Sequence, residues 1–473
     1  MTGTVEDESR PAAVYRTGAA WDEACTRDGS PRAHYAGLME GLAGADLGEL
    51  SRRVQSHLRA AGVSFGGGGG SAFRVDPVPR ILSADEWSRL EAGVAQRTRA
   101  LAQFVSDVYG ERRIVDAGHM PARAIESAGH FEPWMMGVET PAPGYVGGLD
   151  LVRGADGELR VLEDNIRTPS GIAYLLAARG AVDAHLPVGA PEARRDPSSA
   201  YDTLAQTLRD AAPGDVADPS VVVLSDGPQN SAWWEHGQIA QALRLPLVGP
   251  SSLFCRGGRL RVEVDGDTRQ VDVVYRRTDE DRLRDGNGRA TWIADLLLEP
   301  VRQGTLAVVN PLGCGVADDK LVHAYVETMV RFYLQEEPVL RSVPTHDLGD
   351  PEVRESALSR IGELVVKPRG GLGGQGIVVG PHASSETLRE IANRVAENPE
   401  EWIAQELVAL STHPTVCAGR LEPRHVDLRP FAIGGPGKAQ VVPGGLTRVA
   451  FDRGNIVVNS SQNGGGKDTW VIA

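Results

Sequence analysis

The sequence predicts a mixed α/β protein whose strands lie in more than one sheet. Residues 86–109 repeat apolar side chains at helical spacing. Residues 199–340 alternate short apolar strands with helices, a pattern typical of an α/β layer. Residues 365–380 are two β-type runs joined by a glycine-rich loop. A chain of 473 residues is long enough for two or three domains with their own cores.

Composition and charge narrow the class of protein. Hydrophobic residues make up 41% and charged residues 24%, as in ordinary globular proteins. The net charge of −14, without a concentrated basic patch, disfavours nucleic acid and anionic membrane as partners. The four cysteines are far apart and form no CxxC motif, so neither a disulfide framework nor a zinc site is expected. No apolar run approaches the length of a membrane span, and we expect a cytoplasmic protein.

The N-terminal part combines weak helical periodicity with flexible segments. Residues 35–61 favour helix, residues before 16 have a disordered composition, and the glycine run at 66–70 is expected to be a loop or linker. Residues 86–109 then predict a long amphipathic helix, with its arginines on the solvent face.

Residues 147–171 have the pattern of a β-hairpin that ends in polar side chains. Glu163 and Asn165 alternate with Asp164, so on a strand they share one face, about 7 Å apart. Asp150 on the partner strand is expected opposite them. Two carboxylates and an amide oxygen suit Mg²⁺ bound together with phosphates, whereas the alternative is a solvated strand end.

The α/β layer is expected to carry polar groups at the ends of its strands and helices. The pattern predicts strands at 220–224, 246–249, 259–264 and 271–276, and a helix at 230–243. Asn230 and Glu235 stand at a loop and helix start, where ligands are commonly bound. Arg276 and Arg277 end a strand, and for Arg277 a surface charge is the favoured interpretation.

Residues 316–334 predict one helix with an acidic N-cap at Asp318 or Asp319. Lys320 lies in its first turn, where the helix dipole opposes a cation. Its position is explained either by pairing with Asp318 or by an anionic ligand.

The glycine-rich loop of residues 365–380 is the strongest single signal. Five glycines let backbone N–H groups approach an anion closely, and Lys367 stands at the base of the loop. The loop contains the letters GxGxxG, but a strand follows instead of the helix that a dinucleotide fold requires. A Walker loop is excluded, because neither the glycine nor the Ser or Thr that it needs stands around Lys467. The alternative is a flexible hairpin with a solvated lysine.

The region after this loop is mostly β. We expect a helix at 384–396, an edge or crossing strand at 402–408 that carries Gln405 and Glu406, and β runs at 425–431, 440–451 and 455–461.

Ten blocks in one order resemble the circularly permuted ATP-grasp family, the branch of glutathionylspermidine synthetase-like carboxylate-amine ligases. From about residue 60 onward they are DLVR, VLEDNIRTPSG, NSAWWEH, VVYRR, GVADDK, VVKPRGGLGGQG, WIAQE, HVDLRPF, PGGLTRV and VNSSQNGGGKDTW. The resemblance implies a circularly permuted ATP-grasp fold, in which an antiparallel sheet clamps the nucleotide and an α/β substrate layer is inserted. The expected divisions are 1–80, 81–198, 199–318 and 319–473. The glycine run at 66–70 departs from the family, where this stretch is usually β-like.

The resemblance also implies site residues, with ATP and Mg²⁺ as cofactors. The metal ligands would be Asp150, Glu163 and Asn165. Contacts to ATP would come from Lys320, Lys367, Gly370, Gly371, Gly373, Gly374, Gln375, Gly376, Gln405 and Glu406. Catalytic roles would fall to Arg429, Lys367 and Arg276, and the carboxylate substrate would contact Arg153, Ser170, Asn230, Glu235 and Arg276.

The activity implied is an ADP-forming carboxylate-amine ligase that acts through an acylphosphate on a small peptide or amino-acid-like acid. Positioning and charge neutralisation would carry the reaction, which needs no nucleophilic side chain. Two alternatives stay open: a phosphotransferase that stops at the phosphorylated product, and a non-catalytic peptide-binding protein of the same fold. The acid, the amine and the oligomeric state do not follow from the sequence.

Overall fold

The computed structural model describes residues 15–68, 70–139, 144–214, 216–370, 376–435, 437–455, 458 and 464–472. The expectation for the first fourteen residues lies outside this range, as do most of the β run expected at 455–461 and the loop residues Gly371, Gly373, Gly374 and Gln375.

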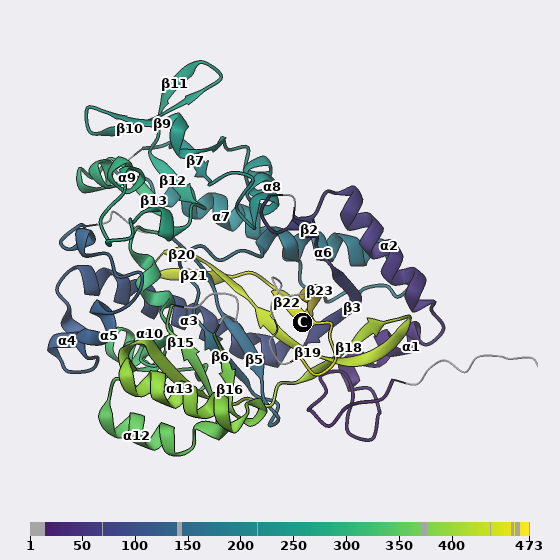
Figure 1. The fold of residues 1–473 in the computed structure, drawn as a ribbon. Helices are drawn as coiled ribbons and strands as arrows, with labels where there is room; N and C mark the ends of the chain where they lie inside the picture. The colour runs from purple at the N-terminus through teal and green to yellow at the C-terminus, as the bar shows by residue number, and fades with distance from the viewer. Residues whose placement is uncertain are drawn as a thin grey trace, which may run out of the picture.

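A seven-stranded mixed sheet forms the centre of the molecule (Figure 1). Its strand order is β3-β23-β22-β19-β5-β6, and β18 also pairs with β19. All pairs are antiparallel except β3 with β23. The strands are β3 (Val75–Leu82), β5 (Asp150–Arg153), β6 (Leu159–Glu163), β18 (Thr412–Cys417), β19 (Arg420–Arg429), β22 (Leu446–Ala450) and β23 (Gly464–Val471). Segments from both ends of the chain therefore meet in one sheet.

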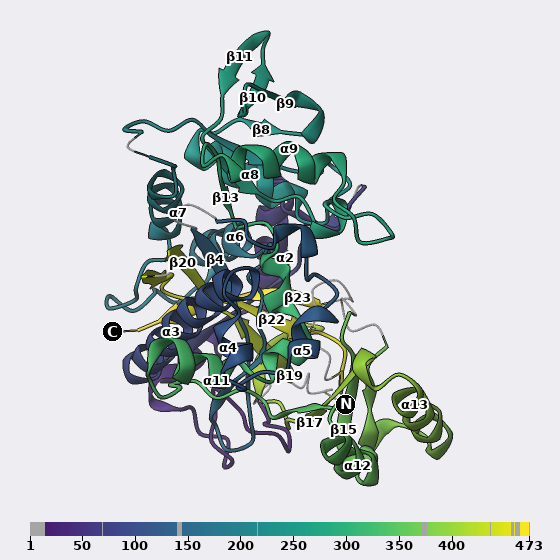
Figure 2. The ribbon, with the colours of Figure 1, turned by 90° about the vertical axis from the view of Figure 1, so that its left-hand side faces the viewer.

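The inserted α/β layer is a separate parallel sheet, at the top of Figures 1 and 2. Its strands are β7 (Val221–Leu224), β8 (Leu247–Val248), β12 (Val273–Arg276) and β13 (Ala307–Val309), in the order β13-β12-β7-β8. The helices of this layer are α7 (Ser199–Asp210), α8 (Trp233–Leu243) and α9 (Trp292–Arg302). A small antiparallel sheet of β9 (Leu253–Arg256), β10 (Arg259–Val264) and β11 (Asp267–Gln270) projects beyond it. The strand and helix alternation of this region is confirmed.

The glycine-rich loop belongs to a four-stranded antiparallel sheet with the order β14-β17-β15-β16. Its strands are β14 (Thr345–Asp347), β15 (Leu364–Pro368), β16 (Val378–Val379) and β17 (Trp402–Glu406). The helices α12 (Pro351–Ser359) and α13 (Ser385–Glu397) lie beside it (Figure 2). The strand expected at 402–408 as an edge or crossing strand is β17; because it pairs with both β14 and β15, the edge alternative is wrong.

A further, three-stranded antiparallel sheet consists of strands that directly precede or follow strands of the central sheet along the chain. It contains β4 (Tyr145–Gly148), β20 (Phe431–Gly435) and β21 (Lys438–Val441). The β run expected at 440–451 is thus two strands in different sheets, β21 and β22. The chain breaks between them at Gly444, whose φ of +123° suits glycine.

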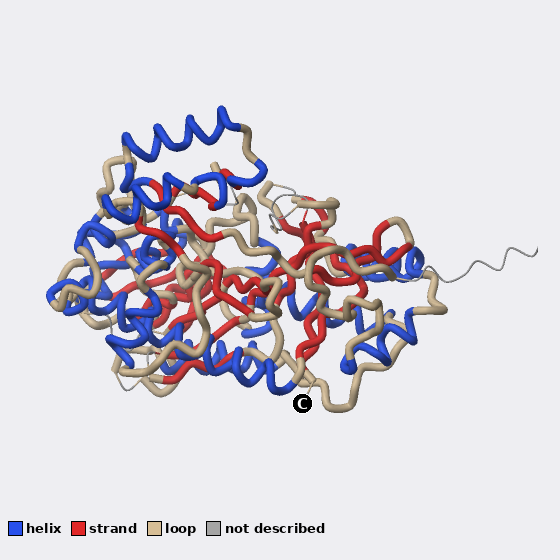
Figure 3. The backbone as a smooth tube through the Cα atoms, turned by 90° about the horizontal axis from the view of Figure 1, so that it is seen from below, coloured by secondary structure: helices blue, strands red, loops and turns tan. Residues whose placement is uncertain are grey.

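The longest helix, α3 (Ala84–Tyr109), confirms the helix predicted at 86–109. Ser83 caps it by accepting a hydrogen bond from the Glu86 N–H at 3.4 Å. Its apolar stripe is buried, but the expected solvent position of its arginines is wrong for Arg97, which is 2% exposed. Seen from below, strands run through the middle of the molecule and helices flank them (Figure 3).

The single helix expected at 316–334 is broken into short pieces. They are the 3₁₀ segment Cys314–Asp318, α10 (Lys320–His323), α11 (Val326–Met329) and the π segment Val330–Leu334. Asp319 is the N-cap of α10, which confirms one of the two expected caps: its backbone is extended and its side chain accepts hydrogen bonds from the N–H groups of Leu321 and Val322. A turn at Ala324 and Tyr325 separates α10 from α11.

The N-terminal segment packs onto the central sheet. It contains α1 (Ala36–Leu42), α2 (Leu47–Ala60) and the hairpin of β1 (Ser64–Phe65) and β2 (Ser71–Ala72), whose turn includes Gly66, Gly67, Gly68 and Gly70 of the glycine run. The remaining helices are α4 (Arg113–Asp116), α5 (Ala122–Glu126) and α6 (Ile172–His185). Within the described ranges, no helix has the length and apolar character needed to cross a bilayer.

Candidate active site

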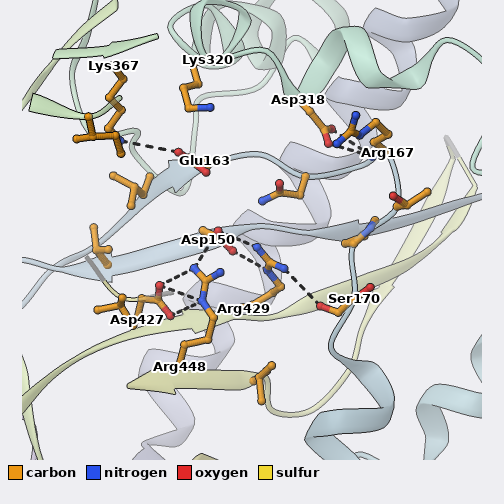
Figure 4. A pocket seen from close by; sticks show the side chains of 18 of the residues that line it. Asp150, Glu163, Arg167, Ser170, Asp318, Lys320, Lys367, Asp427, Arg429 and Arg448 are labelled. Carbon is orange, nitrogen blue, oxygen red and sulfur yellow. Dashed lines mark hydrogen bonds and ion pairs between the residues drawn. The ribbon is translucent and has the colours of Figure 1, made fainter. Parts of the chain in front are cut away.

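A cavity of about 640 Å³ opens between the central sheet, the glycine-hairpin sheet and the parallel layer (Figure 4). Its volume is that of a pocket for a small ligand, for which about 300–1,000 Å³ is usual. Most of the site residues expected from the sequence line it: Asp150, Glu163, Asn165, Ser170, Asn230, Lys320, Lys367, Gly370, Gln405, Glu406 and Arg429. Residues from four distant parts of the chain are therefore brought together.

The pair Glu163 and Asn165 is aimed into the cavity by the residue between them. Asp164 points the other way and is 3% exposed. It accepts hydrogen bonds from Arg97 on α3 at 2.5 and 2.9 Å and contacts His323 Nδ1 at 2.6 Å. Burial opposes ionisation, but the charges of Arg97 and His323 outweigh it and lower the pKa of Asp164. This buried anchor fixes the end of β6.

Lys367 stands in the cavity wall at the base of the glycine loop, on β15. It is 5% exposed, and its Nζ donates to Gln405 Oε1 at 2.6 Å and lies 3.8 Å from Glu163 Oε1. Burial lowers the pKa of Lys367, and the nearby Lys320 adds to this effect, while Glu163 opposes it. Gln405 is held in turn by Thr345 Oγ1 at 3.0 Å, so the ammonium has a defined position.

Arg369 fixes the first turn of the loop to the rest of the protein. Its guanidinium donates to Asp319 Oδ1 at 3.0 Å and to the Ala124 carbonyl oxygen at 2.9 Å. Its own carbonyl oxygen lies 3.5 Å from Lys320 Nζ. Lys320 and Lys367 lie beside each other along the wall of the cavity at the base of the loop (Figure 4). Gly376, where the described chain resumes, has a φ of +72°.

Two arginines and two aspartates alternate on the floor of the cavity, on β5, β19 and β22 (Figure 4). Arg429 donates to both carboxylate oxygens of Asp150, at 2.6 and 2.8 Å. Arg448 lies 2.9 Å from Asp150 and donates to Asp427 at 2.5 Å. Burial raises the pKa of Asp150, but the two guanidinium groups outweigh it and the pKa is lowered. Asp427 and Arg448 are site residues that the sequence analysis missed.

The end of the cavity near the parallel layer is formed by Ser170, Asn230, His236 and Arg277. Arg277 donates to Ser170 Oγ at 2.6 Å and is only 3% exposed, so the surface interpretation of Arg277 is wrong. It follows directly after β12, inside the protein.

Three expected substrate residues do not line the described cavity. Arg276 is fully buried and donates to the carbonyl oxygens of Thr278 and Asn310, at 3.1 and 3.3 Å. Arg153 lies on the opposite face of β5 from Asp150, because side chains alternate along a strand, and it contacts Glu23 at 3.3 Å.

Glu235 supports the site from outside the cavity lining. Its Oε1 accepts hydrogen bonds from the N–H groups of Gly171 and Ala173, at 2.8 and 3.0 Å, at the start of α6. It therefore holds the turn that carries Ser170. The positions of Arg153, Arg276 and Glu235 give them structural contacts in place of the expected contact with a substrate.

Two of the oxygen donors in the cavity suit a magnesium ion. Glu163 and Asn165 supply hard oxygen ligands on one strand end, and the Asn165 amide nitrogen is buried without a hydrogen-bond partner. Both oxygens of Asp150 are bound by arginine. Over the described ranges, no group of three or more His, Cys, Asp and Glu side chains is arranged for a metal. Glu163 and Asn165 thus fit an ion that takes its other ligands from phosphate oxygens and water.

The buried His236 predicts a pH-dependent stability. Its Nδ1 lies 2.8 Å from Ser225 Oγ, and burial, aided by the charge of Arg277, lowers its pKa to about 2. The unfolded chain takes up a proton below about pH 6.5 that the folded chain does not, so the free energy of unfolding should be largest above pH 6.5 and fall as the pH decreases, by up to about 1.4 kcal/mol per pH unit from this group.

Urea unfolding of wild type and His236→Asn between pH 5 and 7 measures this effect. The variant should show the smaller loss of stability on acidification, whereas the exposed His382→Asn should behave like wild type. Equal pH dependence in wild type and His236→Asn would contradict the assignment.

The cavity thus lies between the glycine-hairpin sheet and the pair Glu163 and Asn165, the arrangement that the ATP-grasp resemblance implied. The family model for circularly permuted ATP-grasp proteins of type 2 matches residues 79–450. The chain therefore belongs to the circularly permuted ATP-grasp type 2 family. This confirms the resemblance inferred from the sequence blocks and the fold that it implied.

Similar chains come from several bacteria. An uncharacterized protein of Mycobacterium tuberculosis is 42% identical, over 96% of this chain and 84% of the relative. An uncharacterized protein of Synechocystis is 40% identical, over 97% and 98%. A Frankia casuarinae protein named "Putative glutamate--cysteine ligase 2-2" is 43% identical over 95% of this chain, but this chain spans only 53% of that protein.

Among solved structures, the glutathione synthetase-like effector GSS30 of Globodera pallida, in its apo form, has a similar fold. The TM-score is 0.58 at 13% sequence identity, with 90% of this chain and 96% of the other covered. At this identity the likeness concerns the fold alone.

Proposed function

We propose that this protein is an ATP-dependent, ADP-forming ligase that joins a small carboxylic acid to an amine. One observation carries the proposal: two lysines, a carboxylate and amide pair and an arginine converge on one cavity, although Asp150 and Arg429, for example, are 279 positions apart. Family membership supports ATP as the substrate. The name of the Frankia relative supports a ligase, but it describes a protein of which this chain matches about half, so it identifies neither the acid nor the amine.

In this proposal Lys320, Lys367 and the backbone of the glycine loop hold the phosphates of ATP. Both lysines border the base of the loop, and Gln405 positions the Lys367 ammonium. Glu406 lies at the rim, where its carboxylate pairs with Arg360 and with His346 Nε2, the latter at 2.8 Å, and would face the ribose or adenine. Cations around the phosphates reduce the charge that would repel a second anion.

Glu163 and Asn165 would hold Mg²⁺, which neutralises phosphate charge and orients the transferred group when it is bound. Asp150 is a weaker candidate than the sequence suggested, because its carboxylate is bound by Arg429 and Arg448. It instead holds Arg429, which would face the transferred phosphoryl group.

Two displacements complete the reaction. An oxygen of the substrate carboxylate attacks the γ-phosphorus, the bond to the bridging oxygen breaks, and ADP leaves with that oxygen. The amine nitrogen then attacks the carbonyl carbon of the acylphosphate, phosphate leaves, and the nitrogen gives up a proton. Arg429 stabilises the charge on the phosphoryl oxygens, and a cavity from which water is excluded would protect the acylphosphate from hydrolysis.

The test is ATP turnover with a panel of acids and hydroxylamine as a general amine. A ligase should form ADP, phosphate and a hydroxamate in equal amounts, and only when acid is present. Because hydroxylamine also converts a released acylphosphate to a hydroxamate, the assay is repeated without amine, and continued ADP release with no requirement for an amine would indicate a phosphotransferase. Absence of ATP binding by calorimetry would contradict both enzymes and favour a binding protein.

Glu163→Gln tests the metal ligand within this proposal. The amide keeps the size of the side chain but removes the charge, so ADP formation should fall by about 10²-fold or more, and half-maximal activity should need more Mg²⁺. The exposed Glu158→Gln, on the same hairpin, is the control and should be unaffected. A Mg²⁺ titration that is identical in Glu163→Gln and wild type would contradict the role of Glu163.

A further inference from the structure

An apolar wall borders the cavity near Ser170, apart from the residues proposed to contact ATP. It consists of Phe65 and Phe73 from the N-terminal segment, Tyr174 on α6 and Leu446 on β22, all of which line the cavity. The Tyr174 ring centre lies 5.8 Å from that of Phe65 and 4.8 Å from that of Phe73. Its hydroxyl donates to the Ser64 carbonyl oxygen at 2.8 Å, which fixes the ring.

The apolar wall lies directly beside Arg429, which the proposed function places at the transferred phosphoryl group. Leu446 is the cross-strand partner of Arg429, so the two side chains leave adjacent strands toward the cavity. Phe73 and Leu446 both pack over the backbone of Gly466, where an added Cβ would lie 3.0 and 3.1 Å from them. A carboxylate held at Arg429 would thus have the apolar wall next to it.

The glycine run at 66–70, which the family resemblance did not explain, holds Phe65 in this wall. The Gly66 N–H donates to the Ser231 carbonyl oxygen at 2.9 Å, and the Gly68 N–H to that of Pro228 at 3.0 Å. A Cβ on Gly67 would lie 1.9 Å from the Gln229 carbonyl oxygen. Only glycine lets the two backbones lie this close, and their contact joins the β1–β2 hairpin to the loop of Asn230.

Polar groups stand at the border of the apolar wall. His236 lines the cavity, and Ser225 Oγ contacts its Nδ1. Ser225 Oγ also accepts from the Gly227 N–H at 3.2 Å, so this hydroxyl holds the His236 ring in place between α8 and the loop after β7. With Asn230 and Arg277 beside it, this border suits the polar backbone of an amino acid and the wall suits its side chain.

We infer that the acid substrate is an amino-acid-like molecule with a large apolar or aromatic side chain, and that Phe65, Phe73 and Tyr174 select it. This inference rests on the proposed ligase function and specifies its substrate class. Aromatic side chains bury a large area against such a wall, and even one methylene in an apolar pocket changes specificity by about 10–200-fold.

The experiment measures hydroxamate formation from L-phenylalanine, L-leucine, L-alanine and L-glutamate, with ATP, Mg²⁺ and excess hydroxylamine. The kcat/KM for phenylalanine or leucine should exceed that for alanine and glutamate by about tenfold or more. A preference for alanine or glutamate, or equal values for all four, would overturn the inference.

Two variants test the wall itself. Phe65→Ala, which removes a half-buried ring, and Gly67→Val, which forces the hairpin off the loop at 228–231, should both reduce the preference for phenylalanine over alanine and leave the KM for ATP unchanged. Phe254→Ala is the matched control, because it removes an equally half-buried phenylalanine from β9, outside the cavity lining. Selectivity in Phe65→Ala equal to that of wild type would overturn the assignment.

Equilibrium binding separates this inference from the ligase function. Calorimetry with L-phenylalanine and L-alanine, in the presence of Mg²⁺ and a non-hydrolysable ATP analogue, needs no turnover. Binding that favours phenylalanine and is lost in Phe65→Ala would support the wall even if no ADP forms, in which case only the ligase proposal fails. Equal binding of both amino acids would refute the wall whether or not ADP forms.

Discussion

Replacing Lys367 with alanine is expected to lower the rate of ADP formation by about 10²-fold or more, because it removes a buried cation aimed at the site of phosphate charge. Gln405 holds the Lys367 ammonium in position, and the side chain is only 5% exposed. In the alanine variant, water would therefore be a poor substitute for the lost positive charge. Burial lowers the pKa of Lys367, and a bound triphosphate would raise it again, which couples the charge of this side chain to ATP binding.

Steady-state ADP release with saturating acid and hydroxylamine measures the loss. Lys438→Ala, which removes an exposed lysine from β21, should retain full activity. Thermal unfolding of both variants verifies that they fold. Turnover in Lys367→Ala close to that of wild type would refute the assignment of the phosphate site to the glycine hairpin.

Arg80→Ala is expected to cause the largest loss of stability, about 3–5 kcal/mol, because it leaves a buried carboxylate without its main partner. Arg80 on β3 is fully buried and donates to both oxygens of Glu23, each at 2.6 Å, and Glu23 is 3% exposed. Burial raises the pKa of Glu23, but Arg80 and Arg153 outweigh it and lower the pKa to about 2. The stabilising contribution of Glu23 should be complete above about pH 4.5 and disappear as the pH falls toward 2.

Denaturant unfolding at pH 7 and pH 4 measures both effects. Arg52→Ala, which breaks an exposed contact with Glu49, should leave the midpoint unchanged. An Arg80→Ala protein that unfolds at the wild-type denaturant concentration would show that this ion pair does not hold the N-terminal segment to the sheet.

Local patterns predicted the glycine hairpin and the pair Glu163 and Asn165, because both depend on short-range spacing. A loop of glycines between β runs and an alternation of period two are visible without knowing the rest of the fold. The cavity residues Asp427 and Arg448 were missed for the opposite reason. They are cross-strand partners, and the sequence of one strand does not determine its register with the next strand.

Arg97 and Lys467 show why buried charges are hard to predict. Each lies in a stretch where a charged residue is usually solvated, and each is buried because a distant carboxylate meets it: Asp164 for Arg97, and Asp76 for Lys467. The prediction of a single helix at 316–334 was wrong for a different reason. Its apolar spacing is real and Asp319 caps it as expected, but the residues before Asp319 form a 3₁₀ segment and a turn at Ala324 and Tyr325 divides the residues after it.

The parallel pairing of β3 with β23 has a consequence for how the protein is made. Lys467 contacts the Val78 carbonyl oxygen 389 positions away, so β3 emerges from the ribosome long before its neighbour exists. At about 5–20 residues per second the delay is roughly 20 to 80 seconds. Throughout that interval the edge of β3, a strand that is buried along its whole length in the folded protein, stays open to other nascent chains, so production in cells should depend on chaperone supply.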